Sequence, residues 1–206
     1  MTKLLYIQAS PRGAASGSIA VADAYLAALK AKTPDLEVDV LDPWTANLPE
    51  FDGNRAAAKY TVFGGGTNEG SQATVWDEIV AIADRFISAD RYLFAIPMWN
   101  GGIPYKLKQY IDVIHQPGLL FGLDPATGYF GLLKDKQATV VYTSGAFAQS
   151  MPSPAYGIDH QSSYMTAWLN QAGVTDITEI RYQPTILTAD GEGDFERAKA
   201  AAAAAA

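Results

Sequence analysis

The 206-residue chain contains no cysteine, which excludes disulfides, thiolate metal sites, iron–sulfur clusters and cysteine nucleophiles. Only two histidines occur, and no set of metal-ligating residues converges around them in the sequence, so we expect no metal. No apolar run is long enough to span a membrane, and no basic-then-apolar leader opens the chain. We therefore expect a cytoplasmic protein with no membrane partner.

Positive charge is also scarce. The chain has 15 Lys and Arg against 22 Asp and Glu, a formal net charge of −7. A nucleic-acid binder needs a basic face to displace counterions, so we expect no nucleic-acid partner. The length suits one large α/β domain, and no linker or internal repeat divides the chain, so we expect a single domain over residues 1–206.

Several familiar motifs are absent as well. Gly64-x-Gly66 is followed by Glu69, which does not complete the dinucleotide fingerprint, and neither a Walker A sequence nor a Gly-x-Ser-x-Gly elbow occurs. Asp159-His160 invites a catalytic role, but a histidine at a helix start is the preferred interpretation. His115 is expected to close a helix and interact with its C-terminal carbonyls.

Apolar runs alternate along the chain with segments of helical periodicity. The predicted strands cover residues 4–8, 36–41, 91–96, 138–142 and 176–181. The predicted helices cover residues 16–32, 54–59, 72–88, 104–115, 159–172 and 194–206. Residues 119–133, rich in Gly and aromatics, indicate a β-hairpin-like insertion. Five strands separated by helices predict an α/β fold with a parallel sheet covered on both faces.

Ligands of open parallel sheets bind beyond the carboxyl ends of the strands. Three unusual loops follow the first, third and fourth predicted strands: residues 9–18, 97–104 and 143–154. Because these strand ends meet at one edge, we expect the three loops to form one site.

The first loop reads ASPRGAASGS and leads into a helix N-terminus. Free N–H groups and a partial positive charge at that terminus favour an anion, although the dipole alone contributes only about 0.3–1 kcal/mol. Charge-assisted hydrogen bonds of about 1.5–3 kcal/mol each would add to it. A plain serine N-cap is the alternative, but capping needs one serine and the loop has three. We predict that a phosphate monoester is held by Ser10, Arg12, Ser16, Gly17 and Ser18.

The second loop reads PMWNGGIP. Its Asn-Gly-Gly sequence is typical of a tight turn, and its tryptophan comes shortly after the predicted strand 91–96. Such a loop can lay backbone N–H groups along the edge of a flat heterocycle, while a tight turn with the tryptophan in the core is an equal alternative. The candidate contacts are Pro97, Met98, Trp99, Asn100 and Gly101.

The third loop reads TSGAF and again combines small residues with hydroxyls at a strand end. It is suited to border the other side of a planar ring through Thr143, Ser144, Gly145 and Ala146. Together the three loops specify a ligand with a phosphate at one end and a planar ring at the other. A mononucleotide such as FMN fits best, and it implies a strand order of 2-1-3-4-5.

The segments SPRGAASGS, PMWNGGIPYKLKQYID and TSGAF, in this order and spacing, resemble the FMN-dependent NADH-azoreductase family, also called NADH:quinone oxidoreductases. The similarity covers nearly the whole chain. It implies a flavodoxin-like fold and a homodimer with FMN at the dimer interface. By position, it implies phosphate contacts at Ser10 and residues 16–18, and ring contacts at residues 98–101 and 143–146. The family often has an aromatic residue where this chain has Gly101, and Gly-Gly where it has Gly145-Ala146, which leaves the substrate range open.

The resemblance implies a ping-pong reaction in which NADH or NADPH reduces the flavin and a quinone or azo compound then takes two electrons. No residue is assigned as a catalytic acid, because the flavin carries the chemistry. Four aromatic residues are candidates for the substrate pocket, with packing of the insertion or of a dimer interface as the alternative: Phe121, Tyr129, Phe130 and Phe147. The rival functions are a flavodoxin-type electron carrier and a flavin reductase that releases FMN.

Overall fold

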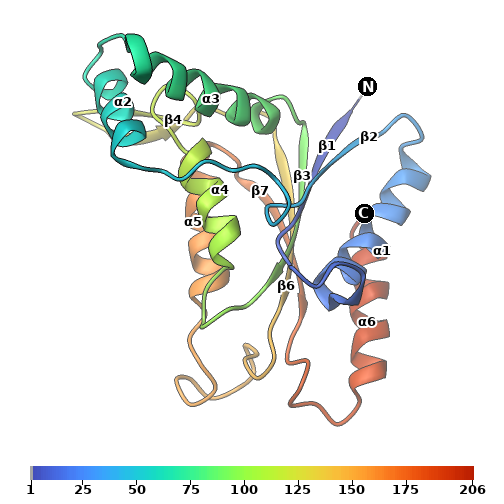
Figure 1. Cartoon of the computed structure of the whole chain (residues 1–206). Helices are drawn as coiled ribbons and strands as arrows, with labels where there is room; N and C mark the ends of the chain where they lie inside the picture. Colours follow the sequence, from blue (N-terminus) through green and yellow to red (C-terminus); the bar gives the residue numbers. More distant parts are fainter. Residues whose placement is uncertain (1) are drawn as a thin grey trace.

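The computed structural model describes residues 2–206 as a parallel five-stranded sheet with helices on both faces (Figure 1). The sheet strands are β1 (Lys3–Gln8), β2 (Glu37–Leu41), β3 (Arg91–Pro97), β6 (Gln137–Thr143) and β7 (Asp176–Tyr182). Their spatial order is β2-β1-β3-β6-β7, and every pair is parallel. Counted along the chain, this is the order 2-1-3-4-5, so the predicted fold class is confirmed.

The helices form a layer on each face of the sheet. One layer holds α1 (Gly17–Lys32) and α6 (Gly191–Ala204); the other holds α3 (Gly70–Ile87), α4 (Tyr105–Ile114) and α5 (His160–Ala172). A short 3-10 turn, η1 (Gly13–Ala15), precedes α1, and α2 (Gly53–Phe63) packs against α3. Side chains of β1 alternate between the two layers: Leu5 and Ile7 join the core under α3, α4 and α5, and Leu4 and Tyr6 join the core under α1 and α6.

The helix α2 is longer than the predicted segment 54–59. Its N-terminus is fixed by Asp52, whose carboxylate accepts the N–H of Arg55 at 3.0 Å. It then continues to Phe63 and ends at the glycine run that follows. The other predicted elements are present with boundaries shifted by two residues or fewer, apart from α6, which begins three residues earlier than predicted, at Gly191, and ends at Ala204.

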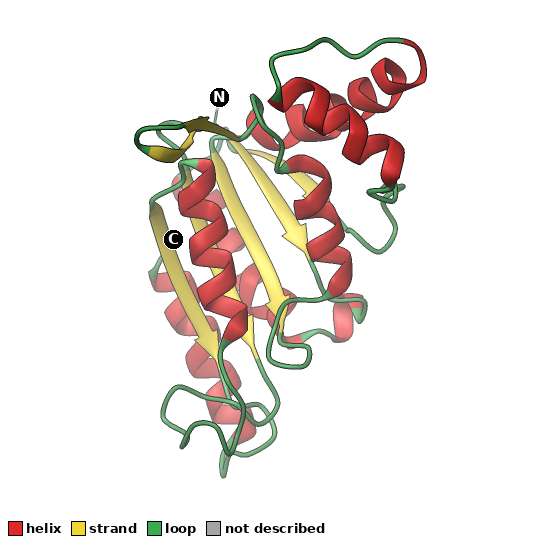
Figure 2. Cartoon of the chain, turned by 90° about the vertical axis from the view of Figure 1, so that its left-hand side faces the viewer, coloured by secondary structure: helices red, strands yellow, loops and turns green. Residues whose placement is uncertain are grey.

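The predicted insertion is an antiparallel hairpin of β4 (Phe121–Asp124) and β5 (Gly128–Gly131), outside the main sheet. It is attached to the C-terminal end of α5, where the N–H of Leu133 donates to the carbonyl of Ala172 at 3.0 Å. The hairpin therefore lies at the amino ends of the strands, opposite the loops that follow their carboxyl ends (Figure 2).

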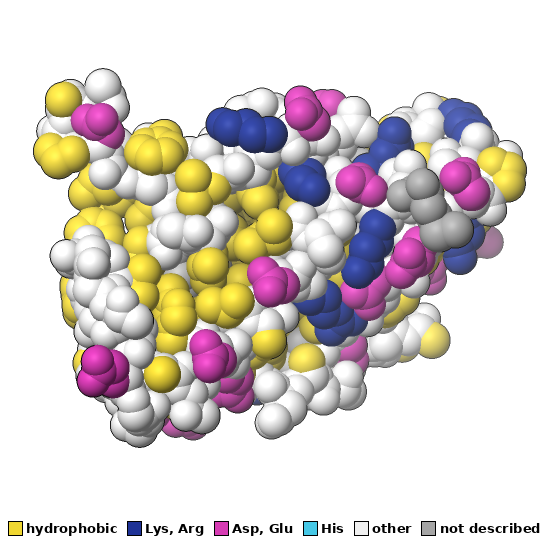
Figure 3. Space-filling model, turned by 90° about the horizontal axis from the view of Figure 1, so that it is seen from above, with side chains coloured by type: hydrophobic (Ala, Val, Ile, Leu, Met, Phe, Trp, Pro, Cys, Tyr) yellow, Lys and Arg dark blue, Asp and Glu magenta, His cyan; other side chains and the backbone are white. Residues whose placement is uncertain are grey.

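Apolar side chains gather at this hairpin end of the molecule (Figure 3). A hollow of about 330 Å³ lies between the end of α2 and the hairpin. Its apolar lining comes from Val62, Phe63, Pro117, Leu123 and Pro125. None of the helices within residues 2–206 combines the length and the hydropathy that crossing a bilayer requires.

Candidate functional site

A pocket of about 680 Å³ opens at the carboxyl edge of the sheet. This volume lies in the usual range of small-molecule sites. The three predicted loops are called loop 1 (residues 9–18), loop 2 (residues 97–104) and loop 3 (residues 143–154). The pocket is lined by residues of loop 1 and by the first residue of loop 2 and the first residue of loop 3. They are Ser10, Arg12, Ala14, Ala15, Ser16, Gly17, Pro97 and Thr143. The structure thus brings the three loops to one edge, as the strand order requires.

Loop 1 presents a set of donors without protein partners. Ser16 is the N-cap of α1, and its hydroxyl accepts the N–H of Ile19 at 3.5 Å. The hydroxyls of Ser16 and Ser18 lie 3.0 Å apart, so one donates to the other and one hydroxyl proton remains available. No acceptor within residues 2–206 takes the N–H of Gly17 or Ser18. This donor set suits a phosphate group at the helix N-terminus.

Charge at the pocket is mixed. Arg12 is exposed, lines the pocket and forms no ion pair with any described residue. Glu192, in the first turn of α6, lines the same pocket and opposes an anion. Loop 1 must also stay small at Gly17, because a Cβ there would lie 3.2 Å from the ring of Tyr182. Anion binding therefore depends on local hydrogen-bond donors and not on net charge.

Loop 2 forms a two-residue hairpin turn. The N–H of Trp99 donates to the carbonyl of Gly102 at 2.9 Å, and the N–H of Gly102 donates back to Trp99 at 2.9 Å. Asn100 and Gly101 between them have φ of 50° and 83°, as the type I′ turn favoured by Asn-Gly requires. The predicted turn is confirmed. Trp99 is 37% exposed, so the alternative in which this tryptophan lies in the core is wrong.

The turn restricts which N–H groups of loop 2 face a ligand. Met98 donates its N–H to the carbonyl of Thr143 at 2.7 Å, and the N–H of Trp99 is used inside the turn. Across the part of the chain that the structure describes, no acceptor takes the N–H of Asn100 or Gly101. The prediction that loop 2 offers successive free N–H groups is therefore wrong for Met98 and Trp99. It is correct for Asn100 and Gly101 at the tip of the loop.

Loop 3 is closed on itself and held by the segment after β7. The hydroxyl of Ser144 donates to the carbonyl of Phe147. The N–H groups of Thr185 and Ile186 donate to carbonyls of loop 3: Thr185 to Ser144 at 2.9 Å and to Gly145 at 3.0 Å, Ile186 to Gly145 at 2.9 Å. Among the residues described, the N–H groups of Gly145 and Ala146 have no acceptor. Loop 3 thus turns the carbonyls of Ser144 and Gly145 to the protein and leaves the N–H groups of Gly145 and Ala146 free.

Sequence reasoning missed two contributors because it considered only three strand ends. Residues 183–190 (loop 4) follow β7, and Ile186 of this loop lines the pocket, 2.9 Å from where a Cβ on Gly145 would stand. Trp44 follows β2; its indole N–H donates to the carbonyl of Ala9 at 3.0 Å and its ring lies 5.4 Å from that of Trp99. Both follow strand carboxyl ends, and the rule that selected the three loops would have found them.

The two histidines occupy different environments. His160 is the first residue of α5, as expected, and its N–H donates to the carbonyl of Gly101 at 3.0 Å. It also lines a groove of about 1140 Å³ beside loop 2, between α4, α5 and residues 48–51. His115 caps α4, but its ring nitrogens have no hydrogen-bond partner within residues 2–206. The predicted contact of its imidazole with helix carbonyls is therefore wrong.

The ring of His115 is instead half-buried beneath the hairpin. It stacks on Phe121 with the ring centroids 4.7 Å apart. Burial lowers the pKa of His115 to about 4, because a charged imidazole would lose its hydration there. His115 is thus a neutral packing residue, far from the loop edge.

Only one of the four aromatic candidates lies at the loop edge of this chain. Phe147 is buried at the end of the closed turn of loop 3. Phe121, Tyr129 and Phe130 belong to the hairpin at the opposite end of the sheet. Tyr129 and Phe130 are 60% and 49% exposed. Their role in a substrate pocket stays a prediction, and it requires a second subunit.

Comparison with known proteins gives a consistent result. A family model described as "Flavodoxin-like fold" matches residues 2–206. The chain is 51% identical over 205 residues to an FMN-dependent NADH:quinone oxidoreductase of Ruegeria pomeroyi, with both chains covered in full. It is 44% identical over 200 residues to another of Burkholderia lata, covering 96% of this chain and 95% of that one. A crystal structure of an FMN-dependent NADH-azoreductase of Bacillus anthracis in complex with FMN superposes with a TM-score of 0.83, at 26% identity and with full coverage of both chains.

Proposed function

Because the chain belongs to the flavodoxin-like family of FMN-dependent NADH:quinone oxidoreductases, we propose that it is an FMN-dependent oxidoreductase that transfers two electrons from NADH, or NADPH, to quinones and azo compounds. We further propose a ping-pong order and a homodimer. The sequence offers no recognisable reader of a ribose 2′-phosphate, so the choice between the two nicotinamide donors is left to measurement.

The observation that carries this proposal is the donor set at the carboxyl edge. Free N–H groups lie in loops 1, 2 and 3, which follow three neighbouring strands of the sheet, and the pocket at this edge is lined by Ser16 and Gly17 of loop 1 and by Pro97 and Thr143, where loops 2 and 3 begin. A phosphate needs several donors at one point, and the edge of an oxidised or reduced flavin ring needs isolated donors along a line. The residues present therefore fit FMN.

Each loop has a distinct task in this proposal. Loop 1 binds the phosphate through the N–H groups of Gly17 and Ser18, the hydroxyls of Ser10 and Ser16, and the cation of Arg12. The free N–H groups at the tip of loop 2 and in loop 3 hold the ring and favour negative charge at its edge. When bound, FMN supplies the two-electron chemistry, accepting hydride from the nicotinamide and passing electrons to the acceptor. No side chain is assigned as a proton donor, and solvent serves that purpose.

The proposed homodimer would complete the substrate side of the site. The hairpin lies too far from the loop edge of its own chain to wall the same pocket. Its exposed aromatic residues Tyr129 and Phe130 are suited to pack on a second copy, where large apolar surface is commonly buried. The groove beside loop 2, with its lining of Phe51, Tyr105 and Tyr164, is the expected receiving surface.

The test uses the absorbance spectrum of the purified protein. We expect a flavin spectrum that survives gel filtration, bleaching under anaerobic conditions when NADH is added, and recovery on addition of benzoquinone. A bound flavin that NADH does not bleach would point to an electron carrier. Colourless protein with yellow flow-through would point to a reductase that releases FMN. Either result would overturn the proposal.

A further inference from the structure

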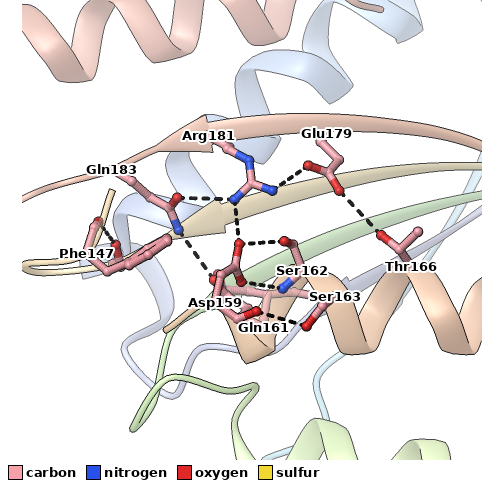
Figure 4. Close-up of polar contacts among 11 residues, drawn as sticks. Phe147, Asp159, Gln161, Ser162, Ser163, Thr166, Glu179, Arg181 and Gln183 are labelled. Carbon is pink, nitrogen blue, oxygen red and sulfur yellow. Dashed lines mark hydrogen bonds and ion pairs between the residues drawn. The ribbon is translucent and has the colours of Figure 1, made fainter. Parts of the chain in front are cut away.

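A polar network lies behind the loops, between the start of α5 and the end of β7 (Figure 4). We refer to Asp159, Gln161, Arg181 and Gln183 as the Gln161 network. Gln161 at its centre has no exposed surface. A fully buried amide has to be satisfied on both its N–H and its C=O side, so its orientation is tightly specified.

Gln161 joins the ends of two strands. Its Nε2 donates to the carbonyl of Ile96 at 3.0 Å, one residue before loop 2 begins. Its Oε1 accepts from Nε2 of Gln183 at 3.4 Å, one residue after β7 ends. Between these strands lies β6, whose carboxyl end begins loop 3. The side chain of Gln161 therefore spans the base of loop 3.

The start of α5 holds loop 2 at two points. The backbone N–H of His160 donates to the carbonyl of Gly101, at the tip of the type I′ turn, and Gln161 holds Ile96 at its base. The carbonyl of Gly101 faces the helix, while its N–H is free. The position of α5 thus sets where the free donors of loop 2 point.

Arg181 fixes the position of α5. Its guanidinium lies 3.2 Å from the Asp159 carboxylate and 3.4 Å from Oε1 of Gln183, and its other nitrogen lies 2.5 Å from Glu179. Asp159 in turn caps α5 by accepting the N–H and the hydroxyl of Ser162, at 2.8 and 2.6 Å. The guanidinium also covers the ring of Tyr142, 5.1 Å from its centroid.

The other branch of the network reaches loop 3. Gln183 precedes Thr185 and Ile186, whose N–H groups occupy the carbonyls of Ser144 and Gly145. Gln161 holds the base of loop 2 through Ile96, and Gln183 begins the segment that holds loop 3. The hydrogen bond between Gln161 and Gln183 therefore connects the two loops. Removing it would free the two loops to shift relative to each other.

We propose that Gln161 is a positioning residue that fixes loop 2 relative to loop 3, and so sets the spacing between the free N–H groups of Asn100 and Gly101 and those of Gly145 and Ala146. It acts through the two backbones and does not itself contact the ring. Its effect on flavin rests on the proposed function. Its effect on the loops does not.

The test compares Gln161→Met with Thr166→Val. Methionine keeps the length of the side chain and removes both hydrogen bonds. Thr166 lies on the same helix and bonds Glu179 across the same interface at 3.4 Å, but its contact reaches neither loop, so its removal is the matched control. Gln183→Met removes the contacts of Gln183 to Gln161 and to Arg181, and it leaves the bond from Gln161 to Ile96 in place.

The first readout is hydrogen exchange of the FMN-free protein. We expect Gln161→Met to accelerate exchange in residues 97–104 and 143–148 at least about tenfold, and Gln183→Met to do so mainly in residues 143–148. Thr166→Val should leave both segments unchanged. If Gln161→Met does not fold, Gln183→Met alone decides, because the inference requires it to loosen loop 3.

The second readout is the bound flavin. Gln161→Met should weaken FMN binding about tenfold and lower the two-electron reduction potential, because misplaced N–H groups stabilise the reduced ring less well. Equal exchange in Gln161→Met and the wild type, or equal changes in Gln161→Met and Thr166→Val, would overturn the inference. If the wild type binds no FMN, the proposed function fails, and the exchange comparison still decides the role of Gln161.

Discussion

The two ends of the central sheet differ in what they leave without a partner. At the carboxyl end, backbone N–H groups of loops 1, 2 and 3 find no acceptor within residues 2–206. At the amino end, the hairpin exposes large apolar side chains: Leu123, Tyr129 and Phe130 are 40%, 60% and 49% exposed. One end offers directional donors and the other offers hydrophobic surface.

This difference indicates two kinds of partner. Unpaired donors in a pocket are costly unless an acceptor fills it, which points to a small anionic or polar ligand. Burying an exposed aromatic ring against another apolar surface lowers the free energy and desolvates few polar atoms, which points to a protein partner. In the proposed homodimer, the two ends would meet across the subunit interface.

The largest expected effect tests the donor end. Ser16→Asp keeps a good N-cap, because aspartate caps α1 as well as serine does, but it places a negative charge beside the proposed phosphate. We expect FMN affinity to fall at least about 100-fold, or roughly 2.7 kcal/mol, with little change in melting temperature. The measurement is flavin content and a fluorescence titration.

Ser16→Asn is the matched control, since asparagine is a neutral cap of the same shape as aspartate. It should retain much more FMN than the aspartate variant. Equal flavin content in the aspartate variant and the wild type would place the phosphate elsewhere.

The second test addresses the apolar end. Changing both Tyr129→Ser and Phe130→Ser removes the exposed rings of the hairpin without emptying the core. We expect the dimer dissociation constant to rise at least about tenfold, seen by analytical ultracentrifugation, because hydrophobic anchors dominate such interfaces. Val40→Ser, an exposed site on β2 at 49%, should leave association unchanged. A double variant that stays as tightly dimeric as the Val40 control would contradict the assignment.

The third test concerns packing beneath the hairpin. The pKa of His115 is lowered to about 4 in the folded state, so between about pH 6.5 and 4 the unfolded state binds more protons. Stability should therefore fall as the pH drops through this window, by roughly 1–2 kcal/mol once the partial exposure of the ring is discounted. Urea unfolding at several pH values measures this slope.

Replacing this side chain by His115→Gln should remove the part of the slope that it causes. His160→Gln, which removes the other histidine, is the control and should leave the contribution of His115 to the pH dependence of stability unchanged. A slope that persists in His115→Gln would assign the acid sensitivity to other groups.

The smallest expected effect lies in the turn of loop 2. Gly101 has φ of 83°, and a Cβ there would stand 3.1 Å from the carbonyl oxygen of Ile158. Gly101→Ala should therefore cost about 1 kcal/mol of stability. At Gly102 φ is ordinary and a Cβ would meet only the carbonyl of Trp99 at 3.8 Å, so Gly102→Ala should be nearly neutral. Thermal unfolding of the two variants is the comparison, and an equal loss in both would argue against strain at the turn.

Much of the fold could be predicted because its signals are local. Periodicity and the Pro and Gly boundaries gave the strands and most helices, and parallel topology then placed loops 1, 2 and 3 at one edge. The extent of α2 was underestimated, since its start depends on a capping carboxylate, that of Asp52.

The site was predicted less completely, because part of it depends on contacts between distant residues. Nothing local to Gln161 or Arg181 marks them, since their partners are as far away as residue 96. The free and the occupied N–H groups of loop 2 could not be separated either, because the bond from Met98 to Thr143 joins two strands. The place of the hairpin depends on where α5 ends in space.

The self-closed turn at Asn100-Gly101 has a kinetic consequence. Its two internal hydrogen bonds hold its shape without help from a ligand. After loss of the cofactor, this turn would therefore keep the conformation that binds FMN. Rebinding of FMN would then need no slow rearrangement of this segment. Mixing deflavinated protein with FMN should accordingly give a single phase whose rate rises in proportion to FMN concentration, with no plateau from a loop-ordering step.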